Sequence, residues 1–273
     1  DVGIEGLKEF RIIIRRSIPL APEQLEDFDG ADEKHRDERA NRIKAETRNE
    51  SEVQILNRIR AEIVKGNRAL RIDETYDGVT RYRLNLMHGL EGDENSPLMI
   101  SALKRCATCA YLDESADTLY LDYYVNEATR QAFRENFDFE VNKSPIALFQ
   151  ALQVLLTLNL YTVSNPLKSD LYKSGSLYVS ETVPTLASDQ RIMRIKHFLL
   201  KKSGVDEPVL LKSLSDGEHQ FLHSLGLSLL FRNTNSLFLL DEPETHFNPD
   251  WRANFATRVR ACFEGSENNH EML

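Results

Sequence analysis

The pattern of hydrophobic and polar positions predicts a mixture of strands and helices. Segments of alternating or β-branched apolar residues indicate strands. These segments are Leu7–Ile14, Val79–Leu86, Thr118–Val125 and Ser176–Val183. Pro19 and Pro22 are expected to break the chain after the first strand, and a helix is expected around Leu98–Tyr111.

Charged residues dominate the segment from Glu23 to about Lys65. In its second half, apolar residues recur at helical spacing on a polar background, which predicts an exposed helical arm or hairpin. They are Val53, Leu56, Ile59 and Ile63. For residues 27–42 a disordered loop is the alternative, because that stretch has almost nothing to bury.

A third pattern occupies Ile146–Tyr161, which is apolar nearly all round. A helix of this kind is expected to be buried within a domain rather than to lie on its surface. Ser144 and Pro145 precede it, and both suit a helix start.

Composition narrows the class of protein. The chain has 273 residues, 41% of them hydrophobic, enough for one large domain or two small ones with a real core. No apolar run approaches the roughly 18 residues that span a bilayer, and the first residues do not resemble a signal peptide. Three cysteines agree with a reducing compartment, so a cytoplasmic protein with no membrane contact is expected. The net charge of −9 argues against a uniformly phosphate-attracting surface but does not exclude a local basic patch.

The first chemical signal is the segment LSDGE, Leu214–Glu218, followed at once by an amphipathic helical run. A helix start of this kind offers an anion free backbone N–H groups, a positive dipole end, a hydroxyl and a glycine that permits close approach. The alternative is an ordinary capping box, with Ser215 as N-cap and Glu218 three residues later. Taken alone, the segment favours the capping box.

The second signal lies about twenty residues later, in LFLLDEP, Leu237–Pro243. Four apolar residues ending in two acids predict a buried parallel strand with Asp241 and Glu242 at its carboxyl end. Ligands of open α/β sheets bind at that end.

The two segments together resemble the signature motif and the Walker B motif of ABC-type ATPases. The continuation ETHFNPDWR is similar to the DEPE-x-H-x-x-P form of SMC-, RecF- and OLD-like ATPases. The resemblance covers Leu210–Leu273 and extends only loosely upstream. It implies an α/β fold, a P-loop NTPase-like ABC ATPase lobe with a helical or mixed insertion.

The resemblance also implies roles for individual residues. Asp241 would hold Mg²⁺, and Glu242 would act as the general base that polarises the attacking water. The signature residues would contact the γ-phosphate of ATP held by the other subunit, and Asn248 would help to join the two halves. The implied nucleotide-contacting set is Ser215, Asp216, Gly217, Glu218 and Asn248.

One element of such an ATPase is missing from the sequence. No Gly-Lys dipeptide occurs, so the phosphate loop with its lysine is absent, and the chain alone is expected to be inactive and to bind ATP feebly. The chain starts at Asp1 without a methionine, so a fragment or the ordered part of something longer is expected. The final residues HEML are expected to begin the next strand; His270 precedes that strand, and no switch role is assigned to it.

Four parts are predicted along the chain: residues 1–22 as a strand-containing segment of the ATPase lobe, 23–75 as a charged arm, 76–205 as a mixed α/β insertion, and 206–273 as the signature and Walker B part. The resemblance, strongest to ATPases of bacterial antiphage or restriction-associated systems, implies an ATP-hydrolysing head-to-head homodimer. DNA, a nuclease or a toxin are the further partners it suggests. A non-hydrolysing scaffold and a transporter nucleotide-binding domain are the alternatives, and the charged arm argues against the second.

Three other features favour ordinary structural roles. Cys106 and Cys109 form a CxxC without a second ligand pair, so no metal site is predicted there. His219 and His223 lie four residues apart on a predicted helix, and polar packing is the favoured role. Trp251 is expected to anchor a helix, Asp250 to Phe263, against the sheet.

Overall fold

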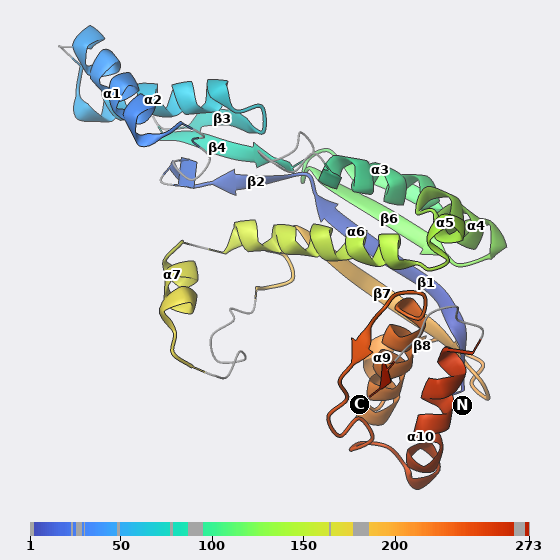
Figure 1. Ribbon diagram of the computed structural model, residues 1–273. Helices are drawn as coiled ribbons and strands as arrows, with labels where there is room; N and C mark the ends of the chain where they lie inside the picture. Colours follow the sequence, from blue (N-terminus) through green and yellow to red (C-terminus); the bar gives the residue numbers. More distant parts are fainter. Residues whose placement is uncertain are drawn as a thin grey trace.

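A computed structural model describes residues 3–22, 24–25, 29, 31–47, 50–76, 79–86, 95–163, 165–176, 186–264 and 271–272. The molecule is elongated, with a helical arm at one end and the C-terminal helices α9 and α10 at the other (Figure 1). The strands are β1 Ile4–Arg15, β2 Ser17–Leu20, β3 Leu70–Tyr76, β4 Val79–Asn85, β5 Cys109–Asp113, β6 Thr118–Tyr124, β7 Met193–Lys202, β8 Val209–Leu210, β9 Leu237–Phe238 and β10 Glu271–Met272. The helices are α1 Glu33–Glu46, α2 Glu52–Gly66, α3 Asn95–Cys106, α4 Glu127–Asn136, α5 Phe139–Asn142, α6 Ile146–Thr157, α7 Asn165–Lys173, α9 Asp216–Leu230 and α10 Pro249–Cys262, with 3₁₀ turns at Leu158–Thr162 and Leu211–Ser213.

The expected α/β class is confirmed, but the sheets are mostly antiparallel. A five-stranded sheet has the order β5-β6-β1-β7-β8, and a three-stranded sheet has the order β2-β4-β3. Every pairing within these two sheets is antiparallel. In the described part of the chain only β9 and β10 pair in parallel.

The central strand β1 confirms the first predicted strand and extends it at both ends. Its β-branched run pairs on both sides, with Ile12 opposite Leu121 of β6 and Ile195 of β7. Alternation of side chains between the two faces then sends Ile12 and Ile14 towards the helices.

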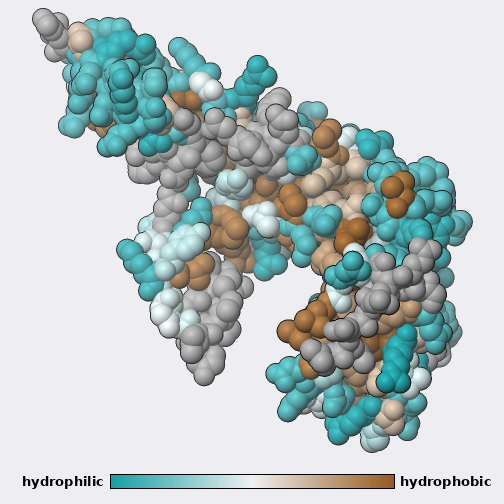
Figure 2. Space-filling model, in the orientation of Figure 1, coloured by the Kyte–Doolittle hydropathy of each residue, from teal (hydrophilic) through white to brown (hydrophobic). Residues whose placement is uncertain are grey.

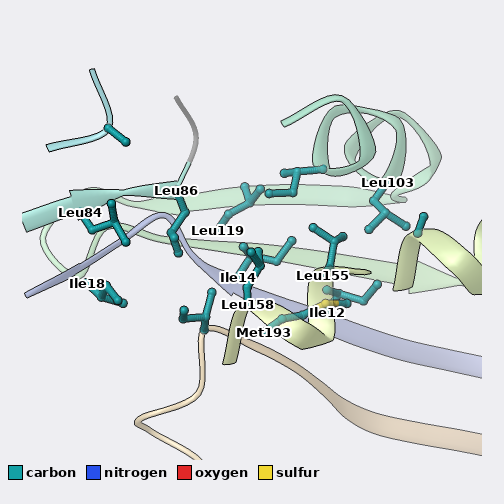
Figure 3. Close-up of a cluster of buried hydrophobic side chains, with 14 of the residues drawn as sticks. Ile12, Ile14, Ile18, Leu84, Leu86, Leu103, Leu119, Leu155, Leu158 and Met193 are labelled. Carbon is teal, nitrogen blue, oxygen red and sulfur yellow. The ribbon is translucent and has the colours of Figure 1, made fainter. Parts of the chain in front are cut away.

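The main core lies between this sheet face and helices α3, α4 and α6 (Figure 3). Aliphatic side chains from distant segments meet there: Ile12, Ile14, Leu103, Leu119, Leu155, Leu158 and Met193. Phe10 stacks on Tyr123 with 4.4 Å between ring centroids, and the Tyr123 hydroxyl donates to the Leu103 carbonyl at 2.9 Å. Each fully buried aliphatic side chain of this kind contributes about 1.5–3 kcal/mol to folding.

The charged segment forms the predicted helical hairpin, α1 and α2, which packs beside the three-stranded sheet. Its surface is strongly hydrophilic (Figure 2). Ion pairs order it where apolar residues are scarce: Arg39 donates to the buried carboxylate of Asp29, and Arg42 contacts Glu62 at 2.5 Å. Residues 33–42 are therefore helical rather than a disordered loop, while residues 27, 28 and 30 lie outside the described residues.

Pro19 does not break the chain as expected but lies within β2. This strand is at the edge of its sheet, and Pro19 is opposite Arg83 of β4. Because an edge strand has one unpaired side, a residue without a backbone N–H can be accommodated there.

Two helix predictions need correction. The helix expected at Leu98–Tyr111 ends at Cys106, and Tyr111 belongs to β5, because residues 109–113 pair with β6. The helix expected to be buried all round is instead half-buried: Ala151 and Leu155 are buried, whereas Leu156 is 42% exposed. The strand predicted at Ser176–Val183 lies almost wholly outside the described residues.

In the described ranges no single helix is long and apolar enough to cross a membrane. The pair Ile146–Thr162 and Pro166–Lys173, bent by 110°, passes the length and composition test only when its two parts are taken together.

Candidate functional site

The C-terminal helices α9 and α10 pack on each other through a second, aromatic core. Its buried residues are Phe221, Phe247, Phe255 and Val259. Trp251, in the first turn of α10, lies 5.3 Å from the Phe221 ring and 6.2 Å from the Phe247 ring. The packing role expected for Trp251 is therefore confirmed, but its partners are a helix and a loop rather than a sheet.

The LSDGE segment forms a capping box at the start of α9. The Ser215 hydroxyl accepts from the Glu218 backbone N–H at 3.3 Å, and Glu218 Oε2 accepts from the Ser215 N–H at 2.8 Å. Ser215 and Asp216 are exposed, whereas Gly217 and Glu218 are buried. Only the first two can meet a ligand with their side chains.

Lys202, at the end of β7, completes the environment of Glu218. Its Nζ lies 2.5 Å from Glu218 Oε1. Burial opposes ionisation of Glu218, but the hydrogen bonds from Lys202 and Ser215 outweigh it and hold the pKa of the carboxyl below its usual range. Glu218 is thus an ionised side chain that fixes the helix start to the large sheet.

Gly217 is required by packing against the same chain. A Cβ at this position would lie 2.5 Å from the carbonyl oxygen of His246 and 3.8 Å from the Trp251 ring. The start of α9 therefore contacts the turn that follows the paired acids. The sequence led us to expect that Gly217 lets a phosphate approach closely. In the structure the group that lies close to Gly217 is the backbone carbonyl of His246.

The strand that leads to the acids is shorter and more exposed than predicted. The parallel pairing is confirmed, since Leu237 is opposite Glu271 and Phe238 opposite Met272. The prediction of a buried strand is wrong: Leu239 is 73% exposed, because the described sheet around β9 has one neighbouring strand only. The strand expected at HEML is confirmed at Glu271–Met272, and His270 lies outside the described residues.

Asp241 and Glu242 follow this strand, and both carboxylates are exposed. Glu242 has a backbone φ of +41°, in the left-handed region that residues other than glycine rarely adopt. The turn is held by Thr245, whose N–H and hydroxyl donate to the Glu242 carbonyl at 3.2 and 2.8 Å. Strained backbone of this kind is concentrated at functional sites.

Asn248 is the N-cap of α10. Its Oδ1 accepts from the Trp251 N–H at 2.8 Å, and Pro249 occupies the first helical position. The side-chain oxygen thus caps the helix, while the residue as a whole stays exposed.

The arrangement brings together some of the predicted residues and reveals two that were missed. The LSDGE turn and the segment His246–Trp251 are in direct contact, so the signature residues and Asn248 border one surface. Lys202 and the His246 carbonyl were not predicted, because both act through contacts between segments distant in sequence. The sequence contained one indication of the role of Lys202, namely the consecutive lysines Lys201 and Lys202 after an apolar segment.

The acids fit Mg²⁺ in part. Magnesium is bound by one or two carboxylates together with water and phosphate oxygens, and two adjacent exposed carboxylates match that donor set. The described residues contain no group of three or more potential ligands, so no complete protein cage is present, and Cys106 and Cys109 do not form one. The sequence has no Gly-Lys loop to bind the phosphates of ATP. The residues present therefore suit Mg²⁺ but do not form a phosphate-binding loop.

Comparison with known proteins gives one match. Residues 23–267 match the family model described as "AAA domain, putative AbiEii toxin, Type IV TA system". No curated protein and no solved structure matches the chain significantly.

Proposed function

Because the chain belongs to this AAA-domain family, whose members are nucleotide-binding ATPases for which Mg²⁺ is the usual metal, we propose that it forms the signature and Walker B part of an ABC-type ATPase head of the SMC/RecF/OLD-like kind. The intact protein would bind and hydrolyse ATP as a head-to-head dimer.

The observation that carries the proposal is the backbone of Glu242. A generic acidic loop end has no need of a left-handed glutamate, which costs about 1–2 kcal/mol relative to an ordinary conformation. The conformation turns the chain sharply after Asp241, so the two consecutive carboxylates are carried by differently oriented backbone units. This supports separate roles, with Asp241 as the metal ligand and Glu242 as the base.

The contact between the LSDGE turn and the segment that starts α10 supports the dimer. Exposed Ser215 and Asp216 lie at the positive end of the α9 dipole, where a phosphate is stabilised. Asn248 lies on the adjoining turn. A second head docked on this surface would meet both motifs at once.

Mg²⁺ would supply charge stabilisation at the transferred phosphoryl group. In this chain Asp241 would hold the ion, and Glu242 would accept a proton from the attacking water. Ser215 would donate its hydroxyl to a phosphate oxygen, at the expense of its bond of 3.0 Å to Glu218 Oε2. The phosphate cradle would come from a segment with a Gly-Lys loop.

The family description supports a biological setting in toxin–antitoxin systems, and the motif resemblance suggests an antiphage role. In that setting the head would control a nuclease or toxin effector, or act on DNA. The protein would work in the cytoplasm.

The test uses the intact protein and two conservative variants. Glu242→Gln keeps the size and the metal site but removes the base, so turnover should fall by about 10²- to 10⁴-fold while ATP binding survives and an ATP-bound dimer accumulates. Asp241→Asn weakens the metal site, so it should reduce Mg²⁺-dependent binding without trapping a dimer. Turnover and light scattering with Mg-ATP distinguish the two. Identical behaviour of the variants, or normal turnover of Glu242→Gln, contradicts the assignment.

A non-hydrolysing scaffold is the second candidate, and the missing Gly-Lys loop is the observation that favours it. Calorimetric titration of the chain with Mg-ATP should show feeble binding under either function. Detection of ATP turnover in the intact protein removes the scaffold.

A further inference from the structure

The five-stranded sheet has a second face, opposite the face that packs against α3, α4 and α6. Strand register defines one row across it, Cys109 opposite Asp122, which is opposite Arg11, which is opposite Lys196. Two residues along, the next row on the same face is Tyr111, Tyr120, Ile13 and Arg194. We call these two rows, with Tyr124, the outer face.

Aromatic rings are prominent on the outer face. Tyr111 is 61% exposed and Tyr124 is 50% exposed. The Tyr111 and Tyr120 rings lie 6.1 Å apart, and the Arg11 guanidinium lies 5.9 Å from the Tyr120 ring centre. Large tyrosine rings exposed to water on a regular strand surface provide flat surfaces on which other rings can stack.

Tyr124 lines a hollow of 340 Å³ on this sheet. Its lining includes the acids Glu9 and Asp122 as well as Arg11, Thr108, Cys109, Tyr124 and His197. Thr108 and Tyr124 are joined through the Thr108 hydroxyl, which accepts from the Tyr124 N–H at 2.9 Å. The hollow therefore combines one aromatic wall with polar groups, which suits a planar heterocycle.

Basic residues gather on the same sheet although the chain as a whole has a net charge of −9. Strand β7 carries Arg194, Lys196, Lys201 and Lys202 and no acid. Arg11 is neutralised by Asp122, which it contacts through two bonds of 2.5 and 2.8 Å. Lys202 is paired with Glu218, and the half-buried Arg194 donates to the Ser188 carbonyl. Lys196, by contrast, is exposed and forms no ion pair with the described residues.

Together the two features match single-stranded nucleic acid. Its bases are free to stack on tyrosine, and its phosphates are attracted to an exposed lysine. A duplex hides the faces of its bases, so exposed rings would gain nothing from it.

We propose that the outer face binds single-stranded nucleic acid, with bases stacked on Tyr111 and Tyr124 and a phosphate against Lys196. This site is separate from the residues assigned to ATP, and the inference does not depend on ATP hydrolysis.

Binding is measured with the full chain and fluorescent single strands, an oligothymidylate and an oligouridylate of equal length, by anisotropy at low salt. Tyr111→Ala and Tyr124→Ala should each weaken binding about fivefold or more, while Tyr111→Phe should retain it because the ring is kept. Tyr172→Ala, at a tyrosine of α7 that is 86% exposed, is the matched control and should have no effect. The DNA and RNA strands show which of the two is preferred.

The phosphate contact has its own readout. Lys196→Gln should weaken binding and reduce the slope of affinity against salt by about one, whereas Lys34→Gln, on the charged arm, should change neither. Both variants replace an exposed lysine, so a non-specific charge effect would appear in both.

Cys109 provides a position-specific check, because it is exposed in the hollow while Cys106 and Cys262 are buried. Bound oligonucleotide should slow its reaction with a thiol reagent severalfold. The proposal is overturned if neither strand binds at low salt, if duplex binds as well and the tyrosine variants have no effect, or if rising protein concentration alone protects Cys109. The last result would make the outer face an interface between copies of the chain.

Discussion

Lys202 Nζ of β7 lies 2.5 Å from Glu218 Oε1 in the first turn of α9. Both side chains are largely buried, and this contact joins the five-stranded sheet to the helix that carries LSDGE. Glu218 therefore serves two partners at once, with Oε2 bound to Ser215 and Oε1 to Lys202.

Removal of either charge should destabilise the protein. Lys202→Met and Glu218→Gln should each lower the free energy of unfolding by about 1–3 kcal/mol, because a partly buried partner is left unpaired. The double variant should lose less than the sum of the two. Urea unfolding followed by circular dichroism measures all three; strictly additive losses contradict a direct pair.

The pair also predicts a pH dependence. The folded-state pKa of Glu218 is lowered, so its contribution is present above the unfolded value of about 4.3 and is lost as the pH falls through the folded pKa. Urea midpoints of the wild-type protein and Lys202→Met should differ at pH 7 and converge in acid. A difference that persists at the lowest pH at which the fold survives contradicts this sign.

Two glycines on the same helix should respond in opposite ways to alanine. Gly217→Ala places a Cβ 2.5 Å from the His246 carbonyl oxygen, so the backbone must shift at a cost of about 1–3 kcal/mol. Gly226→Ala meets nothing within 4 Å and should stabilise α9 by about 0.5–1 kcal/mol. Thermal unfolding of the two variants is the measurement, and equal shifts in Tm would show that the contact with His246 is not close.

Substitutions at Ser215 separate capping from a role at a dimer surface. Ser215→Ala removes the cap and should cost about 1 kcal/mol of stability, with ATP-driven dimerisation of the intact protein retained. Ser215→Arg adds bulk and charge at the exposed helix start, so it should abolish dimerisation and turnover while ATP binding by each subunit persists. If Ser215→Arg dimerises normally, the residue is a helix cap only.

Glycine at position 242 should stabilise the fold and abolish the function proposed for Glu242. The positive φ of +41° is strained for glutamate and unstrained for glycine, so Glu242→Gly should gain about 1 kcal/mol. Asp241→Gly, at a residue without a positive φ, should lose stability, because glycine there only adds freedom to the unfolded chain. Calorimetric melting compares the two, and a loss of stability in Glu242→Gly contradicts a strained turn.

The three cysteines should differ sharply in reactivity. Burial raises the pKa of the Cys106 thiol to about 11 and also raises that of Cys262, whereas Cys109 is exposed. At pH 8 one thiol should react rapidly in the folded protein and three after unfolding. Cys109→Ser should remove the rapid phase, and its survival in that variant would mean that another cysteine is accessible.

The elements predicted well are those specified by local periodicity. β1, β4 and β6 alternate or are β-branched along their own length, and α2 shows the spacing of an amphipathic helix. Ser215 and Glu218 likewise form the capping box that their spacing predicts, since a cap involves only neighbouring residues.

The features predicted poorly depend on distant partners. Residues 109–111 suit a helix locally but form a strand because β6 is available, with Thr108 donating to the Asp122 carbonyl at 2.8 Å. β7 was not predicted, because its basic residues and its irregular register with β1 obscure any alternation. Burial of Leu239 depends on neighbouring strands that a single segment does not reveal.

Pro19 has a further consequence for the edge of the three-stranded sheet. The Leu86 N–H donates to the Arg16 carbonyl at 2.8 Å. Because backbone polar groups alternate in direction along a strand, those of Ile18 face β4, and the backbone nitrogen of Pro19 faces away from it. An incoming strand finds a pyrrolidine ring where it needs a donor. Pro19 therefore hinders the addition of another strand at this edge, which lies at the base of the charged arm.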